Sequence, residues 1–439
     1  MRSCAIGMRL AEILGLSRDE RSALFYALLM KDLGCSSNAS RFAVLFAADD
    51  HALKTRLSQI DWSVALESFR FVAGSVAPGQ FWLRRTWQAL AVFVRGPKGA
   101  SDVVRTRCER GAEIARMLGF SDETAQAIRA LDEHWDGRGQ PNGLKRQEIP
   151  LLGRILGLSQ TAEVFFSTHG VLTMFDMAAE RRGTWFDPDL VDALLSIRGD
   201  GPFWRWLADG DTLAGIGAAE PSDKVFMADD ERLDRIAEAF ARVIDAKSPW
   251  TFEHSNGVAA AATSIASVLG FSDVEVRTLR RAALLHDVGK LGVSSLILDK
   301  PAKLTEAEFA VIRRHPLLTE QILQRVGCFR PLVAVAGAHH ERLDGSGYHQ
   351  GVGGSELSLA ARVLCVADVF DALRASRPYR PALSPAQALD VMGRDVGTAL
   401  DPDCFAALRS VFSALSSPVA DVPPAQHVPA LGTDSHQAA

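Results

Sequence analysis

The chain has 439 residues, of which 47% are hydrophobic and 23% charged, and its formal net charge is −5 at pH 7. This length allows two or three domains, and the mild acidity argues against a nucleic-acid polymer or a membrane surface as partner. Because no apolar run approaches the roughly 18–20 residues of a transmembrane helix and no signal-peptide core follows the N-terminus, we expect a cytoplasmic protein.

Helical periodicity runs through most of the sequence. Apolar residues recur at spacings of three and four over Leu10–Leu14 and again over Val258–Leu269. Further helices are expected from about Asp229 to Ala246 and over Leu279–Leu285. Alternating strand patterns are scarce, so the predicted fold is all-α, with at most one short hairpin near the glycine-rich turns.

The sequence also repeats itself. In each half, a Leu-Gly-x-Ser segment is followed by an aspartate, an Asp-Gly-x-Gly turn, an arginine and an Asp-Pro-Asp segment. The paired landmarks are Leu14–Ser17 with Leu269–Ser272, Asp32 with Asp287, Asp136–Gly139 with Asp344–Gly347, Arg154 with Arg362, and Asp187–Asp189 with Asp401–Asp403. Matches in the same order predict two tandem copies of one helical domain.

The landmarks suggest domain boundaries. The first copy has about 47 more residues than the second between its aspartate and its Asp-Gly turn, and this insertion is expected within Phe42–Ala100. We predict a first domain over residues 1–198, a linker over 199–228, a second domain over 229–415 and a disordered tail over 416–439, rich in proline and small polar residues.

The second copy contains seven residues of metal-ligand type. They are His254, His286, Asp287, His315, His339, His340 and Asp368. A single histidine on an apolar helix is ordinarily a core residue, but burying so many ionisable groups without partners is costly, and a shared cationic centre would offset that cost. Imidazole and carboxylate ligands suit Fe, Mn or Zn, and the absence of a thiolate from the pattern argues against a structural zinc site.

An aspartate beside a histidine has a specific use at such a centre. The imidazole of His286 can bind one metal ion while the carboxylate of Asp287 bridges to a second. Two ions about 3.5–4 Å apart can lower the pKa of a bridging water and clamp the attacking and leaving oxygens of a phosphoryl displacement.

Two segments of this copy resemble the signatures of a known family. His286–Lys290 (HDVGK) and His339–Tyr348 (HHERLDGSGY) are similar to the paired motifs of the HD-GYP phosphodiesterases, within the HD metal-dependent phosphohydrolase superfamily, and Arg377–Arg380 (RPYR) resembles their basic turn. The resemblance covers about Ala246–Ser413. It implies an all-helical core, divalent metal ions with Fe or Mn favoured and Zn or others compatible, and hydrolysis of cyclic di-GMP through a metal-bridged hydroxide.

The resemblance also assigns roles. The seven residues named above would be the metal ligands, with Asp287 bridging, and Asp287 and Lys290 would be catalytic. Lys290, Gly347, Tyr348, Arg377 and Arg380 would bind the substrate, the arginines because their fork can donate two hydrogen bonds to one phosphate. The alternatives are a glycine turn that only shapes the domain and arginines that lie in a solvated turn.

The sequence departs from the family pattern at three positions. His349 stands where the family has proline. Trp250 stands where three-metal members have a glutamate, and since tryptophan is not a plausible ligand, we predict two metal ions. Gly257 replaces the usual arginine, which leaves part of the substrate contact open.

The first copy lacks the ligand set. Repeat alignment places Lys31-Asp32 opposite His286-Asp287, Arg107 opposite His315, Leu131-Asp132 opposite His339-His340, and Gln160 opposite Asp368. The equivalent of His254 would precede Met1, so the chain is expected to begin inside the first helix of the repeat. We predict that this copy is not catalytic and serves regulation or homodimer formation through the N-terminal half.

Three readings of function stay open at this point. The first is a phosphodiesterase for a cyclic dinucleotide, with cyclic di-GMP favoured. The second keeps the metal site but changes the substrate to another nucleotide. The third is a signalling adaptor that binds a partner or nucleotide without turnover.

Overall fold

The computed structural model describes residues 1–35, 102–218, 220–221, 229–248, 253–300, 302–376 and 381–415. Their regular structure is helical, without a named β-strand, which confirms the all-α prediction. The expected hairpin is not formed by these residues; only two isolated bridges occur, Arg182–Phe186 and Val396–Leu400. Among the helices described, none is long and apolar enough to cross a membrane.

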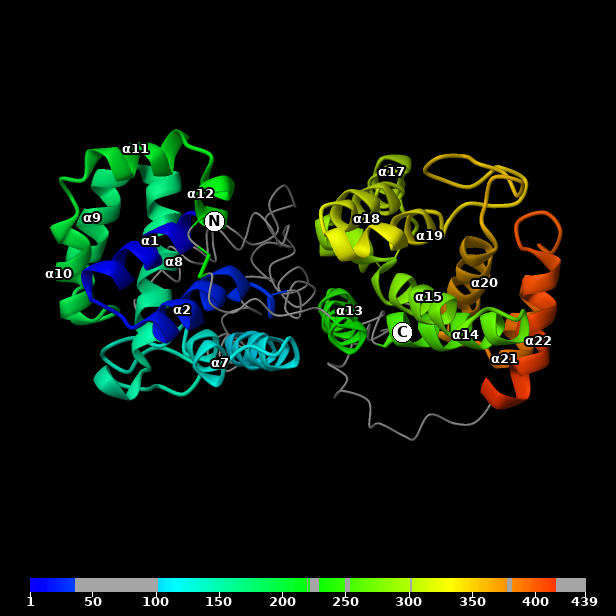
Figure 1. Cartoon of the computed structure of the whole chain (residues 1–439), viewed down its shortest axis with the longest axis horizontal. Helices are drawn as coiled ribbons and strands as arrows, with labels where there is room; N and C mark the ends of the chain where they lie inside the picture. The colour runs from blue at the N-terminus through cyan, green and yellow to red at the C-terminus, as the bar shows by residue number, and fades with distance from the viewer. Residues whose placement is uncertain are drawn as a thin grey trace, which may run out of the picture.

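Two helical bundles lie side by side (Figure 1). The first contains an unlabelled helix at residues 102–117 together with α1 (Arg2–Ile13), α2 (Arg18–Met30), α7 (Asp122–Arg129), η1 (Arg146–Glu148), α8 (Leu151–His169), α9 (Val171–Glu180), α10 (Pro188–Ser196), α11 (Gly201–Asp209) and α12 (Thr212–Ala218).

The helices next to the repeated landmarks follow in the same order in the second bundle. It contains α13 (Asp230–Asp245), α14 (His254–Val268), α15 (Asp273–Leu285), η2 (Val288–Gly292), α16 (Ser295–Leu298), α17 (Glu306–Ile312), α18 (His315–Gln324), η3 (Gly327–Leu332), α19 (Val333–Gly337), α20 (Leu359–Arg374), α21 (Pro385–Met392) and α22 (Pro402–Leu415). The pair α14 and α20 packs together as α1 and α8 do in the first bundle.

The repeated Leu-Gly-x-Ser segment is a helix-to-helix turn. Gly15 and Gly270 end the preceding helix with φ of 64° and 80°, a conformation that glycine adopts without strain. The serine then caps the next helix: Ser17 forms a capping box with Glu20, and Ser272 forms one with Glu275. This turn fixes the angle between α14 and α15. It therefore sets where the C-terminal end of α15, with His286 and Asp287, lies in space.

The other landmarks pair with each other inside each copy. Arg154 contacts Asp187 at 2.5 Å, and Arg362 contacts Asp401 at 2.8 Å. Asp187 and Asp401 also accept backbone amides at the starts of α10 and α22. The spacing that revealed the repeat therefore reflects one conserved packing geometry.

Each bundle has its own hydrophobic core, and part of the expected linker belongs to the first. Trp204 and Leu207 of α11 and Ile216 of α12 are buried in the core of the first bundle. The indole of Trp204 also donates a hydrogen bond to the carbonyl of Ile197. The Gly, Ala and Asp content of this segment predicts a linker, but its aromatic residues pack it onto the first bundle.

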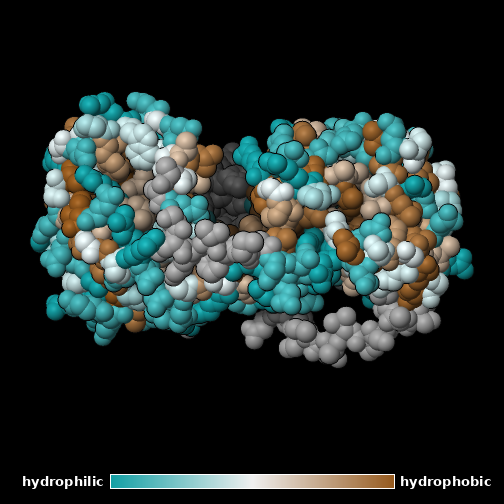
Figure 2. All heavy atoms as spheres, viewed as in Figure 1, coloured by the Kyte–Doolittle hydropathy of each residue, from teal (hydrophilic) through white to brown (hydrophobic). Residues whose placement is uncertain are grey.

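The two bundles contact each other through α13. Ala239 and Val243 of α13 pack against Ile114 of the helix at 102–117. Arg242 forms an ion pair with Glu113 at 2.7 Å beside this contact. Hydrophilic residues predominate on the face shown in Figure 2, with apolar residues in scattered groups over both bundles.

Candidate functional site

The seven ligand-type side chains of the second copy come from five places in the chain and converge. His254 opens α14, His286 and Asp287 end α15, His315 opens α18, His339 and His340 follow α19, and Asp368 lies in α20. All are buried except His340, which is half-buried. The two motif segments and the upstream histidine therefore meet in the core of the second bundle.

Asp287 lies at the centre of this group. Its Oδ1 is 3.2 Å from Nε2 of His315 and 3.7 Å from Nε2 of His339. Its Oδ2 is 3.3 Å from Nε2 of His286 and 3.8 Å from Nε2 of His254. One carboxylate thus faces two histidines with each oxygen, which is the arrangement expected of a bridging ligand.

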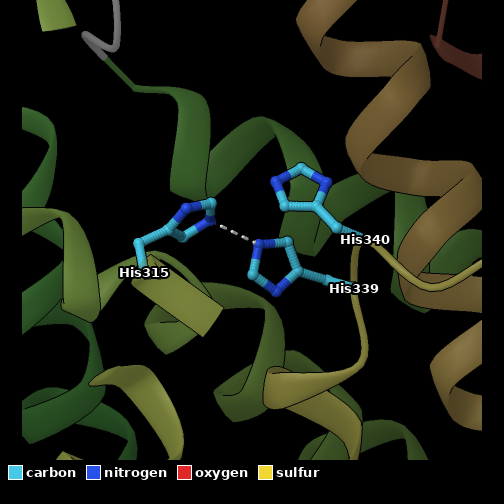
Figure 3. A group of neighbouring side chains, drawn as sticks. All are labelled: His315, His339 and His340. Carbon is cyan, nitrogen blue, oxygen red and sulfur yellow. Dashed lines mark hydrogen bonds between the residues drawn. The ribbon is translucent and has the colours of Figure 1, made fainter. Parts of the chain in front are cut away.

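Asp368 faces the same centre from α20. Its Oδ1 is 3.2 Å from Nε2 of His254 and 3.8 Å from Nε2 of His286, and its Oδ2 is 3.8 Å from Nδ1 of His340. The donor atoms form two groups, His254–His286–Asp287 and His315–His339–His340, each compact enough for one ion. Figure 3 shows the second group, with Nε2 of His315 directed at Nε2 of His339.

Backbone carbonyls orient three of the imidazoles. Nδ1 of His286, His315 and His339 lies 2.6–2.7 Å from the carbonyl oxygen three residues earlier, namely that of Ala283, Ile312 and Ala336. An Nδ1–H that donates to a carbonyl leaves Nε2 as the metal-binding nitrogen. These three rings are therefore held with Nε2 toward Asp287.

The residues present fit a pair of divalent cations. Nε2 of His286 and Oδ1 of Asp287 are fully buried and have no hydrogen-bond partner among the described residues. A buried polar atom without a partner is costly, and two of them aimed at one point call for a ligand there. The donor set of nitrogen and carboxylate oxygen suits Fe, Mn or Zn.

Burial and neighbouring charges shift the pKa values of the side chains in this site in different directions. Burial lowers the pKa of His339 to about 4, helped by the charges of His286 and His315, and burial also lowers the pKa of His340. Burial opposes ionisation of Asp287, but His286 and Lys290 outweigh it and hold the pKa of this carboxyl well below its usual value. Burial opposes protonation of His254 and His286, but the neighbouring aspartates outweigh it, raising the pKa of His254 to about 10 and that of His286 above its usual value. His339 and His340 are therefore already in the neutral form that binds a metal ion, and His254 and His286 would release a proton on binding one.

Of the residues expected to contact substrate, the structure describes Lys290, Gly347 and Tyr348. Nζ of Lys290 on η2 donates to Oδ2 of Asp287. Tyr348 packs its ring 4.8 Å from that of His340. At Gly347 a methyl group would lie 2.6 Å from the carbonyl oxygen of His340, so this glycine is required by the close approach of its own loop. Arg377, Arg380 and Trp250 lie outside the described residues.

Three supporting residues escaped the sequence interpretation. Thr319 donates its hydroxyl to the carbonyl of His286 and accepts the amide of Gly289. Glu341, fully buried, accepts the amides of Gln350 and Gly351 and so holds the glycine loop; Glu133 holds the equivalent loop of the first copy. Asp371 contacts Nδ1 of His254 at 2.6 Å. Glu341 lies within the second motif, but the pattern does not reveal its role, and Thr319 and Asp371 act through contacts distant in sequence.

The first copy carries a guanidinium where the second has ligands. A methyl group at Gly34 would overlap the carbonyl oxygen of Arg107, and one at Gly289 would overlap that of His315. The same close approach of a glycine to the next helix therefore occurs in both copies. The side chain of Arg107 then forms an ion pair with Asp132, the residue opposite His340. Arginine is a permanent cation and cannot ligate a metal ion.

Alanine at Arg107 is therefore expected to weaken the first bundle without affecting the second. Loss of the ion pair leaves Asp132 partly buried and without its cation, at a cost of about 1–3 kcal/mol in the free energy of unfolding. Denaturant unfolding measures this change, and metal content with turnover should match the unsubstituted protein. Loss of bound metal in this variant would contradict the assignment of the metal centre to the second copy alone.

Comparison with known proteins also finds one matching segment in each copy. The model of the HD domain family matches residues 100–190 and 238–404. A 3'3'-cGAMP-specific phosphodiesterase of Vibrio cholerae is 42% identical over 96% of this chain and 92% of its own length. A cyclic di-GMP phosphodiesterase response regulator of Xanthomonas campestris is 38% identical over 41% of this chain and 48% of its own. A crystal structure of a cyclic GMP-AMP-specific phosphodiesterase of V. cholerae covers 94% of this chain and 92% of its own, with 38% identity and a TM-score of 0.60.

Proposed function

The chain belongs to the HD domain family, with HD-GYP phosphodiesterases among its relatives, and from this premise we propose that its second half hydrolyses a phosphodiester bond of a cyclic dinucleotide. The observation that carries the proposal is the convergence of five histidines and two aspartates on one point with two buried atoms left unpartnered. The proposed metal ligands are those seven residues, and the proposed number of ions is two.

We infer 3'3'-cGAMP as the first candidate substrate. The V. cholerae relative specific for this molecule matches nearly the whole chain, including the half without a ligand set. Cyclic di-GMP, which the motifs alone favoured, is the second candidate, supported by relatives that match less than half of the chain. Gly257 and His349, where this chain departs from the family pattern, lie in the half that would bind either molecule.

The residues of the chain define how the reaction would proceed. Two divalent ions, when bound, would activate water and neutralise charge on the scissile phosphate. Asp287 would hold both ions, and the neutral imidazoles of His339 and His340 would complete their coordination. Lys290, already beside Asp287, would donate to a phosphate oxygen and stabilise the negative charge that develops there. Tyr348, packed on His340, would border the bound nucleotide.

A substrate panel tests this proposal. The purified protein, loaded in turn with Mn²⁺, Fe²⁺ and Zn²⁺, is incubated with 3'3'-cGAMP, cyclic di-GMP and cyclic di-AMP, and products are separated by chromatography. We expect metal-dependent hydrolysis with kcat/KM for 3'3'-cGAMP at least tenfold above that for cyclic di-GMP. A preference for cyclic di-GMP would overturn the substrate assignment, and binding without hydrolysis under all three metals would favour the adaptor.

A further inference from the structure

His254 differs from the other buried histidines of the centre in how its ring is held. His286, His315 and His339 each use a carbonyl three residues earlier. His254 is the first residue of α14, and its Nδ1 instead meets a carboxylate on α20, Oδ2 of Asp371, at 2.6 Å. The side chain of His254 is 3% exposed and that of Asp371 18%, so this contact is sheltered from water.

This contact sets the direction of the opposite nitrogen. With Nδ1 bound to Asp371, Nε2 of His254 lies 3.2 Å from Asp368 and 3.8 Å from Asp287. Asp368 and Asp371 are three residues apart on α20, so one helical turn presents one carboxylate to each side of the same ring. A carboxylate behind a ligating histidine fixes its tautomer and raises its basicity.

The carboxylate of Asp371 occupies space that a side chain at position 257 would need. Gly257 lies one turn after Glu253 on α14, and a methyl group built there would overlap Oδ1 of Asp371 and lie 2.7 Å from its Cγ. The absence of a side chain at Gly257 therefore permits the observed contact. The space beside Gly257, where the family pattern has an arginine, is taken by the carboxylate of Asp371.

We propose that Asp371 is the positioning residue for His254, and that Gly257 leaves the space that the carboxylate of Asp371 needs. The inference rests on the metal centre of the proposed function. It predicts that the two residues act as one unit on metal affinity. A side chain at 257 and the loss of the carboxylate at 371 should have the same consequence, because either one releases the ring of His254.

The test measures metal binding by metal-free protein. Mn²⁺ affinity is determined by competition with a chelator and Mn²⁺ content by mass spectrometry for the unsubstituted protein, Asp371→Ala, Gly257→Ala and the double variant. Asp371→Ala is expected to weaken one of the two sites about 10–100-fold. Gly257→Ala should weaken the same site similarly, although alanine is the better helix former and the metal-free protein should melt no lower.

Non-additivity distinguishes a positioning pair from two separate defects. The double variant should bind no more weakly than Asp371→Ala alone, since the side chain at 257 then has no carboxylate to displace. Asp371→Asn, which keeps an oxygen acceptor, should retain part of the lost affinity. Asp390→Ala, at an exposed aspartate of α21, and Ala260→Ser, at an exposed position of α14, are matched controls expected to match the unsubstituted protein.

The outcomes separate this inference from the proposed function. If the unsubstituted protein binds two ions and Asp371→Ala binds both with unchanged affinity, the positioning role is overturned and the metal centre stands. Additive losses in the double variant would overturn the link to Gly257. If the unsubstituted protein binds no Mn²⁺, Fe²⁺ or Zn²⁺, the proposed centre fails and the inference fails with it.

Discussion

Replacing Asp287 by alanine is expected to reduce metal binding and turnover together. The two oxygens of this carboxylate lie 3.2–3.8 Å from Nε2 of four histidines, two in each ligand group, whereas Asp368 approaches His254 and His286 but only His340 of the second group. Without it, His315 and His339 lose the carboxylate that faces them, and Asp368 approaches the second group only at His340, at 3.8 Å. We expect bound Mn²⁺ to fall below half of its normal content and kcat to fall by at least about 10²–10³-fold.

Two further variants decide whether charge or position is responsible. Asp287→Asn preserves shape but removes the negative charge, and it should lose metal as Asp287→Ala does. Asp32→Ala removes the equivalent aspartate of the first copy, which pairs with Lys31 and is 46% exposed, and it should leave metal content and kcat unchanged. Full metal content in Asp287→Ala would refute the bridging role.

Four of the seven candidate ligands could be predicted from short motifs in the sequence. His286-Asp287 and His339-His340 are adjacent pairs, and the glycine turn follows the second pair directly, so each pattern is readable without knowing the fold. His254, His315 and Asp368 stand outside these motifs: the burial argument includes them as candidates, and the family resemblance assigns their role, because nothing local distinguishes a ligating residue from a packed one. The structure brings all seven to one point.

The residues that support the ligands were not predictable in this way. Thr319 holds the carbonyl of His286 from 33 positions away, and Asp371 holds His254 from 117 positions away. Such contacts depend on how α14, α15, α18 and α20 pack, and packing partners are not encoded in a short pattern. One signal was available: Asp371 follows Asp368 by three residues, the spacing of two side chains on one helical face.

The contact between the copies includes η2 of the second copy. Leu291 of η2 packs against the cluster formed by Ile114, Ala239 and Val243, and Leu33 of the first copy packs against the same cluster. Leu291 follows Lys290 directly, so the contact between the bundles lies one residue from the lysine that pairs with Asp287.

A methyl group at Gly289 is expected to damage both stability and metal binding. It would overlap the carbonyl oxygen of His315 and lie 2.8 Å from the amide nitrogen of Thr319, and these are backbone atoms that cannot rotate away. Either η2 or α18 must shift. Because η2 follows Asp287 and α18 begins at His315, the shift changes the distance between these two side chains. We expect Gly289→Ala to lower the free energy of unfolding by about 1–3 kcal/mol and Mn²⁺ affinity by at least tenfold.

The repeat supplies the matched control for this prediction. Gly34 makes the same close approach to the carbonyl oxygen of Arg107, so Gly34→Ala should destabilise the first bundle by a similar amount while Mn²⁺ affinity stays unchanged. Denaturant unfolding and chelator competition on both variants measure the two effects separately. Equal loss of Mn²⁺ affinity in both variants would mean that the metal centre responds to general destabilisation, whereas loss in Gly289→Ala alone ties affinity to the spacing between Asp287 and His315.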